Sequence, residues 1–84
     1  MENKLLVLRD KIGRALYDDC IIYGLVPCVT KEKYHWRLYL NADRGEFEMI
    51  ACEYGYVHCI QPKHLVDMVL VGSFEKHKHL LECD

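Results

Sequence analysis

Residues 34–51 have the sequence YHWRLYLNADRGEFEMIA, and this stretch decides the expected fold. Its first half alternates apolar and polar side chains with a period of two, which is typical of a half-buried strand. A second alternating run follows residues 42–45, whose Asp and Gly favour a turn. The stretch therefore predicts an antiparallel β-hairpin.

The register of this hairpin follows from its apolar residues. A four-residue loop over 42–45 places three apolar pairs on one face. These pairs are Leu40 with Phe47, Leu38 with Met49, and Trp36 with Ala51. A shift by one residue would break all three pairs. We therefore expect this face to be buried, with Trp36 in the core.

The N-terminal residues have a different period. Apolar side chains recur at steps of three and four along residues 3–19, namely Leu5, Leu8, Ile12, Ala15 and Leu16. Asp10 and Arg14 are opposite charges four residues apart, a spacing that stabilises helices. The pattern predicts an amphipathic helix that ends near Asp18 and Asp19. Residues 20–23 then form either a strand or a last buried turn.

The remaining residues are expected to complete the sheet. A turn over 54–56 leads into a third strand over 57–60, and Pro62 ends it. Residues 65–71 combine a helix-start signal at Pro62 with three valines, and we favour a fourth strand. Ser73 is placed to cap a short helix from Phe74 to about Glu82. The expected fold is α+β: an N-terminal amphipathic helix packed on a 3–4-stranded antiparallel sheet, with a short C-terminal helix.

Composition narrows the class of protein. The chain has 84 residues, of which 51% are hydrophobic, and it has no Gly/Ser-rich stretch, so we expect one compact domain over 1–84. The net charge of −2 argues against a protein whose main task is binding nucleic acid. No apolar run reaches the length of a membrane-spanning helix, and no signal peptide is evident, so the expected location is the cytoplasm.

The cysteines and histidines suggest no cofactor. Five cysteines at irregular spacing favour unpaired, mostly buried thiols. No cysteine pair has the close spacing of a zinc site, and the best half-site is His79 with Cys83. His58 and Cys59 could complete it only if adjacent strand residues faced the same side, which they normally do not. We therefore expect no metal site and no cofactor.

Catalysis is not expected either. The best nucleophile–base pair would be Cys52 with His35, directly opposed across the hairpin. An open sheet face is a poor place for it, because catalysis needs a concave site that excludes water. The chain also lacks the glycine-rich loops that bind phosphate. We expect a non-enzymatic protein.

The outward face of the hairpin is the candidate binding surface. Its composition mixes tyrosine, arginine and isoleucine, as protein–protein hot spots do. Its residues are His35, Arg37, Tyr39, Glu48, Ile50, Cys52, Tyr54 and Tyr56. The alternative is that the C-terminal helix covers this face and makes Ile50 and Cys52 part of a second small core. The expected partner is a larger protein or a second copy of the chain.

A nucleic-acid surface is the second functional hypothesis. The segment over 31–44 combines basic and aromatic residues, and its cations are Lys31, Lys33, Arg37 and Arg44. Nearby glutamates cancel much of that field. In size and self-containment alone, the chain resembles the small inhibitors and regulators that phages encode. We therefore expect a binding protein that modulates a larger partner.

Overall fold

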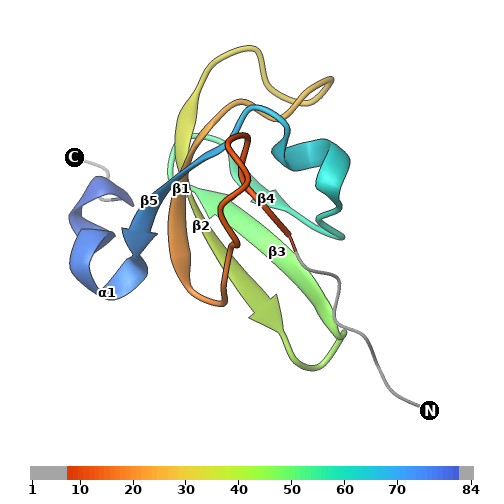
Figure 1. Ribbon diagram of the computed structural model, residues 1–84, viewed down its shortest axis with the longest axis vertical. Coiled ribbons are helices and arrows are strands. Elements are labelled where there is room, and N and C mark those ends of the chain that lie inside the picture. The colour runs from red at the N-terminus through yellow and green to blue at the C-terminus, as the bar shows by residue number, and fades with distance from the viewer. Residues whose placement is uncertain (1–7, 82–84) are drawn as a thin grey trace.

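The computed structural model describes residues 8–81, which form a five-stranded antiparallel sheet in the order β4-β3-β2-β1-β5 (Figure 1). The strands are β1 (Cys20–Gly24), β2 (Tyr34–Asn41), β3 (Glu46–Ala51), β4 (Gly55–Val57) and β5 (Val69–Ser73). The helical elements are the 3-10 turn η1 (Pro62–Leu65), the short α-helix α1 (Phe74–His77) and the 3-10 turn η2 (Lys78–Leu81).

The β2–β3 hairpin has the predicted register. Leu38 pairs with Met49 and Leu40 pairs with Phe47. The ladder extends from Arg37–Ile50 to Asn41–Glu46, so the loop is residues 42–45, and Trp36 and Ala51 are both buried beyond its other end. The loop closes through hydrogen bonds from the Arg44 and Gly45 amides to the Asn41 carbonyl. Gly45 has φ of +66°, a conformation that glycine adopts without steric cost.

The predicted N-terminal amphipathic helix is wrong. Residues 8–19 form an irregular loop that folds back on itself, with a bridge between Arg9 and Ala15 (residues 3–7 lie outside the described part). Leu8 and Leu16 are buried as expected, but the Leu16 amide bonds to the Leu8 carbonyl across the loop. Ile12, expected to face inward, is 65% exposed.

The side chain of Asp10 is the physical reason. Its Oδ1 accepts hydrogen bonds from the amides of Ile12 and Arg14. Such local bonds offer the backbone an alternative to a helix. Gly13 then turns the chain with φ of +89°. The Asp10–Arg14 ion pair does form, at 2.9 Å, but it closes a loop.

The sheet has five strands and not three or four, chiefly because residues 20–24 form a central strand. β1 pairs with both β2 and β5. The third predicted strand is displaced: β4 covers Gly55–Val57, because the turn lies at residues 52–54, before Gly55. In the ambiguous segment both signals contribute, since Pro62 starts the turn η1 and two of the three valines, Val69 and Val71, lie in β5.

One face of the sheet packs on the hydrophobic core. Side chains that alternate along β1, β2 and β3 supply half of it: Cys20, Ile22, Trp36, Leu38, Met49 and Ala51. Segments outside the strands supply the rest: Leu8, Leu16, Val26, Ile60, Leu65 and Met68. The burial of Trp36 agrees with the prediction.

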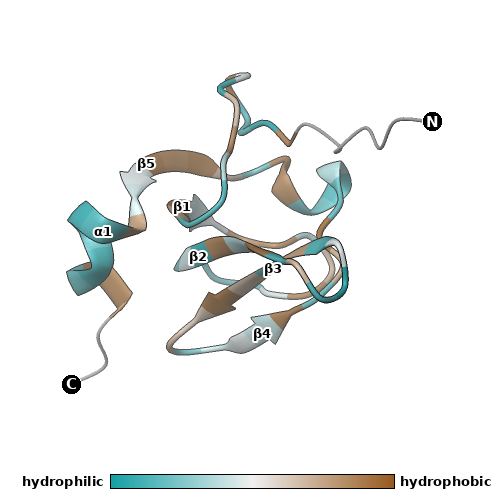
Figure 2. Ribbon diagram, turned by 90° about the horizontal axis from the view of Figure 1, so that it is seen from below, coloured by the Kyte–Doolittle hydropathy of each residue, from teal (hydrophilic) through white to brown (hydrophobic). Residues whose placement is uncertain are grey.

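The C-terminal helical segment lies on the other face. Figures 1 and 2 both show α1 and η1 on opposite sides of the strands. Ser73 caps α1 as predicted, its Oγ accepting a hydrogen bond from the Lys76 amide. Ile21, whose side chain points away from the main core, is fully buried beneath this segment. We call this side of the sheet the outer face.

The described part of the chain contains no helix long and apolar enough to cross a membrane.

Candidate functional site

The outer face of the hairpin holds most of the residues predicted for binding. Alternation along β2 and β3 places His35, Arg37, Tyr39, Glu48 and Ile50 there, and β4 adds Tyr56 opposite Ile50. Ile50 is half-buried, whereas Tyr56 is 58% exposed. Tyr54 departs from the prediction, since its ring lies 5.7 Å from that of Trp36, on the core side.

The side chain of Arg37 is held by other residues of the chain, although it is partly exposed. Its Nε lies 2.6 Å from Asp19 Oδ1. Its guanidinium lies 4.0 Å from the ring centre of Phe74, which is a cation–π geometry. Arg37 therefore connects the loop before β1 to the start of α1.

The carboxylate of Glu48 is a second group on the outer face that several other residues contact. It is buried, and it accepts hydrogen bonds from the Tyr39 hydroxyl at 3.0 Å and the Asn41 amide nitrogen at 3.1 Å. His58 Nδ1 lies 3.2 Å from the same carboxylate. Burial acts to raise the pKa of Glu48, but the hydrogen bonds from His58, Tyr39 and Asn41 outweigh it and lower that pKa. Burial, together with the bond to Glu48, raises the pKa of Tyr39 to about 12.

An open cavity of about 440 Å³ lies between the hairpin and the C-terminal segment. It is lined by Arg37, Ile50, Cys52, Phe74, Lys78 and Leu81. The C-terminal segment therefore covers the β1 side of this face, as one of the two sequence hypotheses expected. It leaves a hollow over Ile50, where the other hypothesis placed a binding surface. The lining is apolar, apart from the two cations at its rim.

The four residues proposed for nucleic-acid binding do not form one patch. Arg44 lies in the loop after β2, and Lys31 and Lys33 precede β2. An eight-residue strand separates these ends by about 25 Å. Lys33, Arg37 and Arg44 each lie within 4.0 Å of a carboxylate, on Asp67, Asp19 and Glu46 respectively.

The cysteines differ from the expectation of five unpaired thiols. Cys52 is disulfide-bonded, whereas Cys20, Cys28 and Cys59 are free. A disulfide sulfur is not a nucleophilic thiolate, so Cys52 and His35 do not form a catalytic pair. His35 instead packs against Tyr23, with ring centroids 4.6 Å apart. The half-site of His79 and Cys83 is untested, because Cys83 lies outside the described residues.

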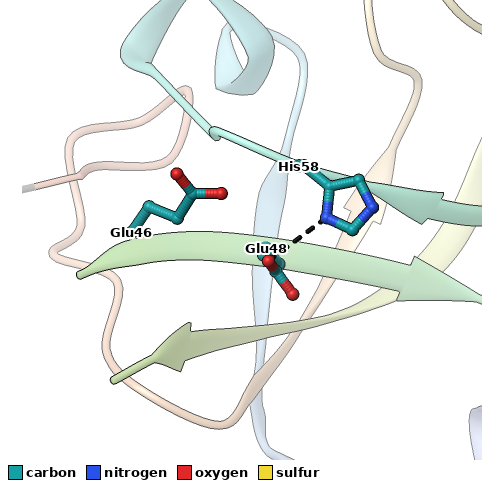
Figure 3. Close-up of side chains that lie close together, drawn as sticks. All are labelled: Glu46, Glu48 and His58. Carbon is teal, nitrogen blue, oxygen red and sulfur yellow. Dashed lines mark ion pairs between the residues drawn. The ribbon is translucent and has the colours of Figure 1, made fainter. Parts of the chain in front are cut away.

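The structure also brings together side chains that sequence reasoning did not combine. Glu46, Glu48 and His58 each present one ligand atom within 4.8 Å of the others (Figure 3). Glu46 and Glu48 lie two apart on β3, and that spacing was visible in the sequence. His58 follows β4, and no sequence signal placed it opposite them, because the position of β4 was expected two residues later.

No protein-family model matches this chain, and no curated protein or solved structure matches it either.

Proposed function

We propose that the protein is a small non-enzymatic binding module that docks on a larger protein through its outer face. The observation that carries this proposal is the cavity over Ile50, between the hairpin and the C-terminal segment. A hollow lined by Ile50, Phe74 and Leu81 suits an apolar anchor side chain of a partner. Tyr56 extends the same face as an exposed aromatic residue.

The charges at the rim define the kind of partner. Arg37 and Lys78 line the cavity, and no carboxylate among residues 8–81 does. Arg37 is already paired with Asp19, but no ion pair involves Lys78 among residues 8–81. We infer that the occupant is a peptide segment in which an aromatic or aliphatic side chain lies next to Asp or Glu. By binding such a segment, the protein would inhibit or regulate the larger partner.

A second copy of the chain is the other candidate partner. β4 is at one edge of the sheet, and each of its residues is half-buried or exposed. The opposite edge, at β5, is instead partly covered, since the Lys11 amide and the Arg14 side chain bond to the Met68 and Leu70 carbonyls. We prefer a larger protein to a second copy of the chain as the partner. The reason is that the cavity, and not the β4 edge, carries the positive charge that would pair with an acidic residue of the partner. Nucleic acid has less support, because three of its four candidate cations have carboxylate neighbours.

The test uses a displayed library of random peptides, with the full chain as bait. Lys78→Glu reverses the charge at the cavity, and Lys76→Glu is the matched control, since Lys76 is exposed on the same helical segment but does not line the cavity. We expect selected peptides to combine an apolar anchor with an acidic residue. They should bind Lys78→Glu at least 10-fold more weakly than wild type and bind Lys76→Glu normally.

Three results would count against this function. One is a selection that enriches no peptide, and another is a set of peptides that bind all three proteins equally. The third is a concentration-dependent dimer that Lys78→Glu leaves intact, which would favour self-association through β4.

A further inference from the structure

The cluster of Glu46, Glu48 and His58 lies at the hairpin-loop end of the outer face, apart from the cavity over Ile50. Glu46 and Glu48 project from β3, and His58 reaches them from the segment after β4 (Figure 3). His58 Nδ1 lies 3.2 Å from Glu48 Oε2. The imidazole is also stacked on the ring of Tyr56, with the two planes 3° apart, which holds its orientation.

Cys59 adds a thiol to this cluster. Two adjacent residues of a regular strand point to opposite faces, and that would separate Cys59 from His58. However, β4 ends at Val57, and Cys59 has φ of +56°, so the regular alternation does not hold here. The Cys59 Sγ lies 3.1 Å from Glu46 Oε1. The thiol therefore lies beside Glu46, one of the two carboxylates of the cluster.

One carboxylate oxygen of Glu46 lacks a hydrogen-bond partner among the described residues. Glu46 Oε2 is buried and has no hydrogen-bond partner within the described part of the chain. The Arg44 Nη1 is 3.9 Å away, too far for a hydrogen bond. Buried polar atoms in proteins are nearly always satisfied, by protein, water or an ion. This oxygen therefore has lone pairs available to a cation that binds between the side chains of the cluster.

We propose that Glu46, Glu48 and His58 form a Zn²⁺ site, with Cys59 as the fourth ligand. In tetrahedral zinc, ligand atoms at the usual bond lengths are about 3.3–3.5 Å from one another. Two of the six separations, 3.2 Å and 3.1 Å, are close to these edges, and the ligand atoms of Glu46, Glu48 and His58 lie within 4.8 Å of one another. Side-chain rotations that bring Cys59 and the other three together would complete the site. An imidazole and a thiolate select zinc over Ca²⁺ and Mg²⁺, which prefer oxygen ligands alone.

The surrounding residues orient this site. Tyr39 and Asn41 hold the Glu48 carboxylate by hydrogen bonds, and such bonds to a metal-binding carboxylate fix its direction. On binding, the Cys59 thiol releases its proton to solvent and its S–H···O bond to Glu46 is replaced by the Zn–S bond. The imidazole binds in its neutral form.

The test starts from full-length protein that has been freed of metal with a chelator and then titrated with ZnCl₂ by calorimetry. We expect one Zn²⁺ per chain. His58→Ala should weaken binding by at least about 100-fold, since loss of even an indirect partner of a metal ligand costs about 10–100-fold. His79→Ala is the matched control, an exposed histidine on η2, and should bind like wild type.

A second readout does not depend on any variant. Zn²⁺ should slow alkylation of Cys59 by iodoacetamide at least 10-fold and leave Cys28, the other exposed free thiol, unaffected. The proposal is overturned if wild type binds no Zn²⁺, if His58→Ala binds as tightly as wild type, or if Ca²⁺ competes equally with Zn²⁺. Unchanged alkylation of Cys59 in the Zn²⁺-bound protein would remove Cys59 from the ligand set.

Discussion

The indole nitrogen of Trp36 donates a hydrogen bond to the carbonyl oxygen of Gly24, at 3.0 Å, inside the core. Trp36 has no exposed surface. This bond connects the side chain of β2 to the C-terminal end of β1, and it satisfies a carbonyl that no water can reach. Both the aromatic volume and the donor of Trp36 therefore contribute to stability.

We expect Trp36→Ala to lower the free energy of unfolding by about 3–5 kcal/mol, the usual range for truncating a buried large aromatic residue. Trp36→Phe keeps much of the volume but leaves the Gly24 carbonyl unsatisfied, at a cost of about 1–3 kcal/mol. Urea unfolding followed by circular dichroism measures both. Equal midpoints for wild type and Trp36→Ala would mean that the indole is exposed in solution.

Gly24 itself should not tolerate a side chain. A Cβ built at Gly24 would lie 2.5 Å from the Asp67 carbonyl oxygen, which is backbone and cannot rotate away. Overpacking of this kind costs about 1–3 kcal/mol, and we expect Gly24→Ala to reach at least the top of that range. Gly13→Ala is the comparison, because a Cβ there meets nothing within 4 Å and only the positive φ opposes it. Thermal unfolding should rank Gly24→Ala as the less stable of the two.

Asp10 should make the fold sensitive to acid. Burial acts to raise the pKa of Asp10, but hydrogen bonds from the Leu70 and Arg14 amides and the charge of Arg14 outweigh it and lower that pKa. A lowered pKa in the folded state contributes stability above the unfolded value of 3.8, and this contribution is lost as the pH falls below it. Asp10→Asn should cost about 1.5–3 kcal/mol at pH 7.

The pH dependence separates this effect from a general loss of packing. The difference in unfolding free energy between wild type and Asp10→Asn should be constant from pH 7 to about pH 5 and shrink below 3.8. Urea titrations at several pH values measure it. A difference that stays constant down to pH 2 would show that the charge of Asp10 is not what stabilises the loop.

Arg37 should affect stability as well as binding. Sequence reasoning placed it on an outward face, and the structure shows it paired with Asp19 and lying over Phe74. The two groups of the ion pair are each more than a third exposed, so that pair contributes at most about 1 kcal/mol. The contact with Phe74 contributes about 0.5–1 kcal/mol more. Arg37→Ala should therefore lower the unfolding free energy by about 1–2 kcal/mol, measured by urea unfolding, and Arg44→Ala, in the exposed hairpin loop, by less than 0.5 kcal/mol.

The free thiols should react in the order of their exposure. Cys28 is exposed and should be alkylated within minutes, whereas Cys20 is fully buried, and burial raises the pKa of its thiol. We expect Cys20 to react only when the protein unfolds. Mass spectrometry of peptides after timed alkylation measures both rates. Reaction of Cys20 at the rate of Cys28 in native protein would show that β1 is not an interior strand of the sheet.

The hairpin over 34–51 could be predicted because its information is local. Two alternating runs and a four-residue turn determine which residues face each other, and a shift by one residue exposes every apolar side chain of the run. The same holds for Ser73, whose side chain caps the next few residues. Alternation along the strands predicted the shared face of Arg37, Tyr39 and Ile50, but Tyr54 lies on the core side instead. The contacts that Arg37 and Glu48 make on that face were not predicted.

The hairpin, its buried face with Trp36 and the cap of the C-terminal helix were therefore predictable, because each depends on residues close together in the chain. The N-terminal segment depends instead on contacts with residues far away in the chain. Asp10 and Arg14 are four residues apart, a spacing that allows their ion pair in a helix and in this loop alike. The loop forms because Asp10 also accepts a hydrogen bond from the Leu70 amide, 60 positions away. The cluster of Glu46, Glu48 and His58 was decided in the same way, since the end of β4 and the left-handed backbone of Cys59 bring its members together. Partners so distant in sequence leave no periodic signal, so their contacts exist only once the chain has folded.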